Sequence, residues 1–211
     1  MRFCSIASGS SGNCIYIGSE QTHMLVDIGI SGKKMEAGLN SIDLTGRDLD
    51  GILITHEHSD HIKGLGVIAR RYGLPVYATE GTIDAMLESG SLGKLPEGIF
   101  HEIREDEAFH VKDLTINPFG IPPRCGTSLF GYRVECGDSS VGIATDLGKY
   151  DEYIVENLQN LDALLLEANH DIRMLQVGRY PYYLKQRILG DRGHLSNENA
   201  GRLLCRLLHD N

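Results

Sequence analysis

The chain has 211 residues, of which 41% are hydrophobic, and carries a formal net charge of −9. This size fits one globular domain over residues 1–211, and so acidic a protein excludes general, non-specific attraction to nucleic acid or anionic membranes. The five cysteines form no CxxC pair, which argues against a disulfide framework or thiolate zinc site and favours a reduced, cytoplasmic compartment. The first residues contain no signal-peptide core and no run approaches the ~18 apolar residues of a membrane span, so we expect a soluble protein that makes no membrane contact.

Strand-length apolar runs alternate with segments whose apolar residues recur at helical spacing. In chain order, we expect strands at Cys14–Ile17, Met24–Val26 and Gly51–Ile54, a helix after Asp60 that stops at Gly73, a strand at Val76–Ala78, a helix from Ile83 to Gly90, a strand at Val141–Ala144, a helix over Tyr150–Leu158, a strand at Ala163–Leu166, a helix from Pro181 to Gly190, and a last helix after the N-cap Ser196. This alternation predicts an α/β (α+β) protein in which helices cover sheets.

The strongest feature is the heptapeptide Thr-His-Glu-His-Ser-Asp-His at 55–61, directly after the apolar run Gly51–Ile54. Imidazole and carboxylate groups suit zinc, manganese or iron. His56 and His58 alternate along the chain and can bind one cation, while Asp60 and His61 can bind a second where the chain turns into a helix. The alternative is a surface histidine cluster in which Asp60 only caps that helix.

Acidic residues also follow three other predicted strands. These are Asp27, Asp146 and Glu167, and His170 lies three residues after Glu167. Polar groups that gather at strand ends form the sites of such folds. We expect Asp146 to be a ligand and Asp27 to hold a ligating histidine in place, whereas Glu167 alone is more often a turn acid.

The heptapeptide resembles the His-x-His-x-Asp-His motif of the metallo-β-lactamase superfamily. The match is closer to one branch, the YycJ (WalJ) proteins, and covers nearly all of the chain. The motifs that carry it, besides the heptapeptide, are Ser8–Asn13, Leu25–Gly29, Thr145–Gly148, Glu167–Asp171 and Gly193–Ser196. The resemblance implies a four-layer αββα sandwich, two divalent metal ions (Zn or Mn), and a cytosolic 5′-to-3′ DNA exonuclease linked to mismatch repair.

Carried over to this chain, the resemblance assigns His56 and His58 to metal one, and Asp60 and His61 to metal two, with Asp146 bridging the ions. A water held between the ions becomes the hydroxide nucleophile. Asp60 thereby serves catalysis directly, and His170 matches the position that protonates the leaving oxygen in related nucleases. The alternative for His170 is a surface loop histidine.

The chain departs from this branch in two places. The stretch Ile121–Leu129 lacks the further metal-one histidine that the superfamily has there. The branch also normally continues for several tens of residues beyond the point where this chain stops, and there supplies the last metal-two histidine. We therefore expect the domain to lack part of its C-terminal half and to bind metal less tightly. His194 resembles that last ligand, but we expect it to open the final helix and to support the site.

A basic, tyrosine-rich stretch lies between His170 and His194. Cations for phosphates and aromatic rings for stacking are typical of nucleic-acid binding, although a solvated helix with inward-facing tyrosines has the same composition. Candidate substrate-binding residues are Asn13, Arg179, Lys185, Arg187 and His194. The sequence thus favours a metal-dependent phosphodiesterase acting on DNA. The alternatives are another hydrolase of the superfamily, with a small phosphodiester or thioester substrate, and an inactive remnant that binds metal weakly.

Overall fold

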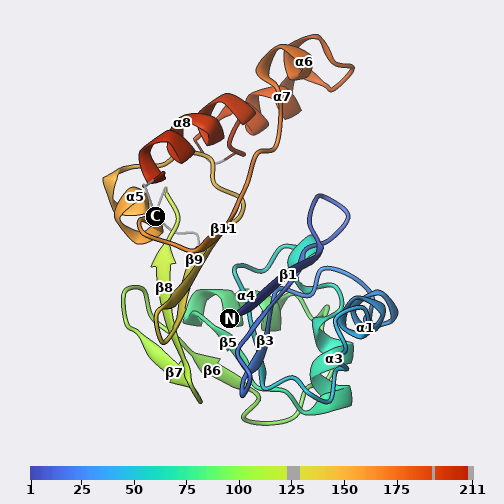
Figure 1. The fold of residues 1–211 in the computed structure, drawn as a ribbon. Helices are drawn as coiled ribbons and strands as arrows, with labels where there is room; N and C mark the ends of the chain where they lie inside the picture. The colour runs from blue at the N-terminus through green and yellow to red at the C-terminus, as the bar shows by residue number, and fades with distance from the viewer. Residues whose placement is uncertain (123–128, 192, 209–211) are drawn as a thin grey trace. The chain divides into compact units, whose positions relative to one another are not determined.

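The computed structural model describes residues 1–122, 129–191 and 193–208. The chain divides into two compact units, Met1–Ile116 and Asn117–Asn211, which are called the N-terminal and C-terminal units below. In Figure 1 the N-terminal unit runs from blue to green and the C-terminal unit from yellow-green to red.

The N-terminal unit is built on a six-stranded sheet whose strands lie in chain order. Strands β1, β2 and β3 are antiparallel to one another, and β3 through β6 run parallel. Because parallel strands need crossover connections, helices lie between them along the chain. The strands are β1 (Arg2–Ala7), β2 (Cys14–Gly18), β3 (His23–Val26), β4 (Gly51–Leu53), β5 (Val76–Ala78) and β6 (Phe100–Glu102).

Four helices belong to the N-terminal unit, namely α1 (Gly32–Asn40), α2 (Ser59–Ile62), α3 (Leu65–Tyr72) and α4 (Glu80–Glu88). Their apolar faces and the sheet form one buried cluster, in which Leu25 and Ile52 of the strands join Met35, Leu65 and Met86 of the helices. Helix α3 ends where the sequence predicts, because Gly73 adopts the left-handed conformation with φ 66°.

The chain passes from one unit to the other within β8 (Leu114–Gly120), whose first residues pair with β7 (Phe109–Val111). In the C-terminal unit, β9 (Phe130–Cys136) and β10 (Ser139–Ala144) form an antiparallel hairpin. Gly137 closes its turn with φ 56°. Strand β11 (Ala163–Leu166) lies parallel to β10.

The helices of the C-terminal unit are α5 (Glu152–Leu158), α6 (Ile172–Val177), α7 (Tyr182–Leu189) and α8 (Asn197–Leu207). Residues of α5 and α8 pack with Phe119 and Ala144 in the core of this unit. The predicted cap of the last helix is confirmed, since the Ser196 side chain accepts a hydrogen bond from Asn199 N at 3.2 Å.

Each predicted strand and helix is present within a few residues of its predicted bounds. The structure adds elements that the sequence did not indicate, namely β1, β6, β7, β8, β9, α1 and α6. The two sheets and their helices confirm the predicted α/β (α+β) class. Within the described residues, no helix combines the length and apolar character that a membrane crossing needs.

Candidate metal centre and active-site residues

Two parallel strand ends bring the first site residues together. Asp27 follows β3, and Thr55 and His56 follow β4, its parallel neighbour in the sheet. The Asp27 amide donates to the Leu53 carbonyl at 2.9 Å, which extends the pairing one residue beyond β3. Asp27 itself adopts φ 60°, a conformation that aspartate tolerates and that non-glycine residues adopt mainly at turns and functional sites. The turn aims its carboxylate at the chain that leaves β4.

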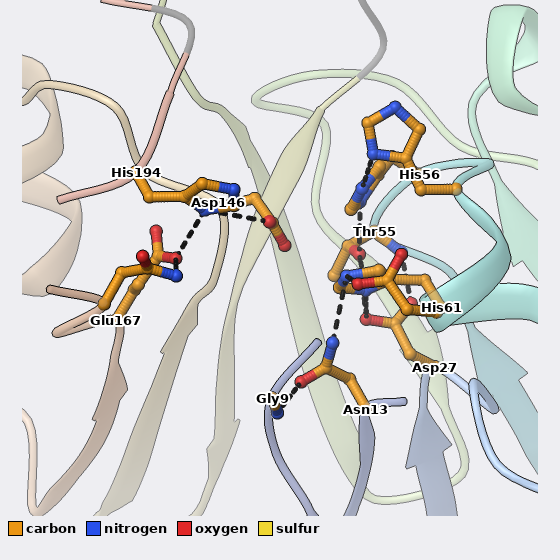
Figure 2. A network of polar contacts seen from close by, with 12 residues as sticks. Gly9, Asn13, Asp27, Thr55, His56, His61, Asp146, Glu167 and His194 are labelled. Carbon is orange, nitrogen blue, oxygen red and sulfur yellow. Dashed lines mark hydrogen bonds and ion pairs between the residues drawn. The ribbon is translucent and has the colours of Figure 1, made fainter. Parts of the chain in front are cut away.

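The Asp27 carboxylate is fully buried and accepts three hydrogen bonds (Figure 2). The Thr55 amide donates to Oδ1 at 2.9 Å and the Thr55 hydroxyl to Oδ2 at 2.8 Å, while His61 Nδ1 donates to Oδ2 at 2.7 Å. A buried carboxylate without such partners would cost several kcal/mol. Burial and these donors therefore fix Asp27, and Asp27 in turn fixes His61.

The partners of His61 also determine which of its ring nitrogens is protonated. Because Nδ1 donates to Asp27, Nε2 carries the lone pair. Nε2 faces the side-chain amide of Asn13, whose Nδ2 donates to it at 3.1 Å, and the Gly9 amide holds the Asn13 oxygen at 3.0 Å. A histidine with one nitrogen on a carboxylate and the other presenting a lone pair has the arrangement of a metal ligand. The Asn13 side chain therefore covers Nε2, the nitrogen with which His61 would bind a metal ion.

His56 and His58 direct their ring nitrogens at one point. The Thr55 hydroxyl lies 3.0 Å from His56 Nδ1, and His56 Nε2 lies 2.8 Å from His58 Nδ1. Two nitrogens on a tetrahedral zinc with bonds of ~2.0 Å would stand about 3.3 Å apart, so a shift of about half an ångström would admit a cation between them. The rings of His56 and His61 also lie close together, with centroids 4.0 Å apart and planes tilted by 47°. We call His56, His58 and His61 the histidine cluster.

Asp60 lies in the first turn of α2, with one carboxylate oxygen 3.7 Å from His61 Nε2. The residue at the N-cap of α2 is His58, so Asp60 does not cap this helix. The backbone around Asp60 is held from two sides, because Asn13 N donates to its carbonyl at 2.8 Å and Gly29 packs against the same oxygen. A Cβ on Gly29 would overlap that carbonyl, so only glycine fits there.

In the C-terminal unit, as in the N-terminal unit, polar residues follow the ends of two neighbouring parallel strands. Asp146 follows β10 with φ 55°, and Glu167 follows β11, its amide bonded to the Ala144 carbonyl at 3.1 Å. His194 Nδ1 lies 2.6 Å from a Glu167 oxygen and 3.4 Å from an Asp146 oxygen (Figure 2). Each of the three offers one ligand atom, and these atoms lie within 4.8 Å of one another, so the group can hold a cation or a mobile proton.

His170 is placed beside this group by a parallel bridge to Ser196, and the Asn197 amide donates to the His170 carbonyl at 2.9 Å. Both ring nitrogens are shielded from solvent and lack a hydrogen-bond partner among the residues that the structure describes. Burial, followed by the nearby His194, lowers the pKa of His170, so its ring is mainly neutral near pH 7.

The basic stretch forms α6, α7 and their connection. Arg179 and Arg187 are exposed there, whereas Lys185 donates to the Gln176 carbonyl at 2.7 Å and so ties α7 to α6. The sequence lacks a metal-one histidine in Ile121–Leu129. Residues 123–128 of this stretch lie outside the described residues, as does Arg192.

In the N-terminal unit the structure thus brings together five predicted site residues, and in the C-terminal unit it places Asp146 beside His194. The five are Asn13, His56, His58, Asp60 and His61. Sequence reasoning left Glu167 out of the candidate site, although its position after an apolar strand run was a signal. It also gave Thr55 no role, since a hydroxyl between two histidines has no distinctive spacing in the sequence.

The chain is similar to known proteins over most of its length. A beta-lactamase superfamily domain model matches residues 24–209. The exodeoxyribonuclease WalJ of Streptococcus pneumoniae serotype 2 is 42% identical over 98% of this chain and 77% of its own length. The exodeoxyribonuclease YycJ of Bacillus anthracis is 38% identical over all of this chain and 78% of its own length. The metallo-beta-lactamase fold protein YhfI of Bacillus subtilis superposes with a TM-score of 0.67 at 20% identity, over 95% of this chain and 76% of that one.

These matches confirm both the family and the metallo-β-lactamase fold that the motifs predict, and this fold is one that binds divalent metal. The chain belongs to the beta-lactamase superfamily and, within it, to the family of the WalJ and YycJ exodeoxyribonucleases.

Proposed function

We propose that the chain is a metal-dependent phosphodiesterase that degrades DNA exonucleolytically, from 5′ to 3′, in the bacterial cytoplasm and in the service of DNA repair. One observation carries the proposal: the buried Asp27 and Thr55 hold the rings of His61 and His56, and His58 lies against His56, so three imidazoles are gathered in one place. The names of the two relatives, similar over nearly the whole chain, support DNA as the substrate.

The donor set fits divalent cations. His56 and His58 would hold one ion, and Asp60 and His61 a second, because imidazole is a good ligand for Zn²⁺ and carboxylate for Mn²⁺. The resemblance adds Asp146 as the bridging ligand. When bound, such ions lower the pKa of water towards neutrality and neutralise phosphate charge. The protein's own contribution is orientation: Asp27 holds His61, and Asn13 covers the ligand nitrogen of His61 until it is displaced.

Departure of a deoxyribose oxygen requires a proton, and two histidines could supply it. The resemblance favours His170, but the contacts favour His194. The Glu167 carboxylate at 2.6 Å fixes the ring of His194, whereas the ring nitrogens of His170 have no hydrogen-bond partner among the described residues and burial lowers its pKa. We therefore propose His194 as the proton donor, Glu167 as its positioning residue, and His170 as a half-buried neighbour.

One assay tests the activity. Purified protein is incubated with 5′-labelled duplex DNA and Mn²⁺ or Zn²⁺, and in parallel with bis-p-nitrophenyl phosphate. Release of labelled nucleotides that is lost in His58→Ala supports the proposal. Turnover of the small diester alone points to another hydrolase of the superfamily, and loss of both reactions to an inactive chain.

The proton donor is tested with His194→Ala and His170→Ala in the same assay. Removal of a general acid costs about 10²- to 10⁴-fold in rate. We expect this loss in His194→Ala, and rescue of the rate with a substrate whose leaving group, such as p-nitrophenolate, needs no proton. A large loss in His170→Ala with the same rescue would instead assign the role to His170.

A further inference from the structure

The segment between Ile172 and Leu189, called the α6–α7 segment here, differs in charge from the rest of the protein. It carries four cationic side chains and no acidic one, in a chain whose net charge is −9. The four are Arg173, Arg179, Lys185 and Arg187. An isolated cationic patch on an acidic protein attracts polyanions locally while the remaining surface repels them.

The segment also buries very little. Helix α7 has no buried residue, and α6 buries only Leu175. An eight-residue helix is not stable alone, so local contacts hold it: the Lys185 side chain caps α6, and the Leu184 and Lys185 amides donate to the Pro181 carbonyl. Figure 1 shows α6 and α7 beside each other at one end of the C-terminal unit, beyond α8. Such an element contributes little to the core.

Aromatic rings are exposed on the outer side of α7. Tyr182 is 77% exposed and Tyr183 74%, and Arg187 one turn further on is exposed as well, while Leu184 and Ile188 on the opposite side are half-buried. Tyr180, just before the helix, is 57% exposed. The sequence left open whether these tyrosines pack inward. The structure shows that the segment's three tyrosine rings are exposed to solvent, as are its three arginines, Arg173, Arg179 and Arg187.

The chain on either side of the α6–α7 segment lies beside Glu167 and His194, the acidic and basic residues of the C-terminal unit that contact each other. His170, just before α6, is bridged to Ser196, and the Asn169 amide donates to the Leu195 carbonyl at 2.9 Å, one residue from His194. His194 N and Gly193 N bond to the Ile188 and Gly190 carbonyls at the end of α7. An extended polymer bound along α7 would therefore have one end close to Glu167 and His194.

We propose that the α6–α7 segment is a platform for single-stranded DNA. Unpaired bases stack on Tyr182 and Tyr183, and Arg179 and Arg187 contact the phosphates between them. In duplex DNA the base faces are already stacked on one another, so exposed tyrosines can stack only with unpaired bases. The inference rests on the proposed function and refines it: the enzyme takes hold of a frayed or single-stranded end before it cleaves.

The test measures binding apart from cleavage. Fluorescence anisotropy with labelled oligothymidylate, and with a duplex of equal length, is recorded in EDTA. We expect wild-type protein to bind the single strand at least about tenfold more tightly. Tyr182→Ala/Tyr183→Ala should lower the single-strand affinity about tenfold or more, since stacking is worth ~1–3 kcal/mol per base. Tyr182→Phe/Tyr183→Phe keeps the rings and should bind as wild type does.

Leu87→Ala, at an exposed apolar residue of α4 in the N-terminal unit, is the control and should bind both ligands as wild type does. Equal affinity for single strand and duplex, or an alanine variant that binds like the phenylalanine variant, would overturn the platform. A change in sedimentation of the alanine variant would point to a protein interface and overturn it too. If wild type binds single strands as expected but digests no DNA, the exonuclease proposal fails and the platform stands.

Discussion

The histidine cluster and the α6–α7 segment are prepared for their ligands in opposite ways. Around the histidine cluster, Asp27, Thr55 and His61 are all buried and bonded to one another, so the proposed cation ligands are positioned by the core of the N-terminal unit. On the α6–α7 segment, tyrosines and arginines stand in solvent with almost no core beneath them. A small cation requires ligands in a fixed geometry, whereas a long, flexible polyanion can be bound by an exposed surface that carries positive charge and aromatic rings.

Amide hydrogen exchange measures this contrast directly and should show the largest effect. The Ile52 and Ile54 amides lie inside the parallel sheet, whereas the α7 amides belong to a helix with no buried residue. We expect the α7 amides to exchange about 10³-fold faster or more, because local opening of α7 leaves the core intact. Protection of α7 equal to that of β4 would remove the distinction between the two regions.

Replacement of Gly29 tests how tightly the cluster depends on the backbone. In Gly29→Ala the new methyl group would overlap the Asp60 carbonyl, so we expect a loss of about 3 kcal/mol or more in the free energy of unfolding. The matched control is Gly201→Ala in α8, where no atom lies within 4 Å of the new Cβ; helix propensity should make it neutral or stabilising by up to ~1 kcal/mol. Urea denaturation compares the two, and equal midpoints would contradict the close approach.

Asp27→Asn tests the hydrogen bonds behind the ligands. The amide has one acceptor oxygen where the carboxylate has two, so its NH2 group would face either the Thr55 amide or the donors Thr55 hydroxyl and His61 Nδ1. We therefore expect 10- to 100-fold weaker metal binding, as is typical for such partners, and a loss of about 1–3 kcal/mol in stability. Asp43→Asn is the control, because Asp43 has the same positive φ, 61°, but is exposed. Metal titration and thermal unfolding should give the control the metal affinity and stability of wild type. An Asp27→Asn protein that keeps wild-type metal affinity would show that Asp27 does not orient His61.

The smallest effect concerns charge on the α6–α7 segment. Arg179→Gln/Arg187→Gln should reduce the slope of log K against log salt for single-stranded DNA by about 1.4, which corresponds to ~0.7 for each phosphate that is no longer neutralised. Arg104→Gln, an exposed arginine of the N-terminal unit paired with Glu102, should leave the slope unchanged. An identical slope in the double variant would mean that these two cations face away from the bound strand.

Strands with continuous apolar runs could be predicted because both of their faces are buried, as in β2, whose five residues are all buried. Strand β1 could not, since it lies at the edge of its sheet and mixes exposed and half-buried residues. Helix α1 buries only Met35 and Leu39, too few to mark an apolar stripe in the sequence.

The same logic separates the two groups of polar residues. The histidine cluster lies within six residues of one another and is visible in the sequence. The contact between Glu167 and His194 depends on how β11 pairs with β10 and on where the chain returns after α7, and neither is encoded locally. A contact between residues distant in sequence depends on the register in which the strands pair, and this register is seen only in the folded chain.

The bridge between His170 and Ser196 joins the chain on the two sides of the α6–α7 segment, and Leu175 is the only residue of these two helices that is buried. The exposed positions of the helices can therefore change at little cost to the core of the C-terminal unit. On the proposal above, such changes would alter how strongly the segment binds DNA, provided that the Ile188 and Gly190 carbonyls keep their bonds to His194 N and Gly193 N.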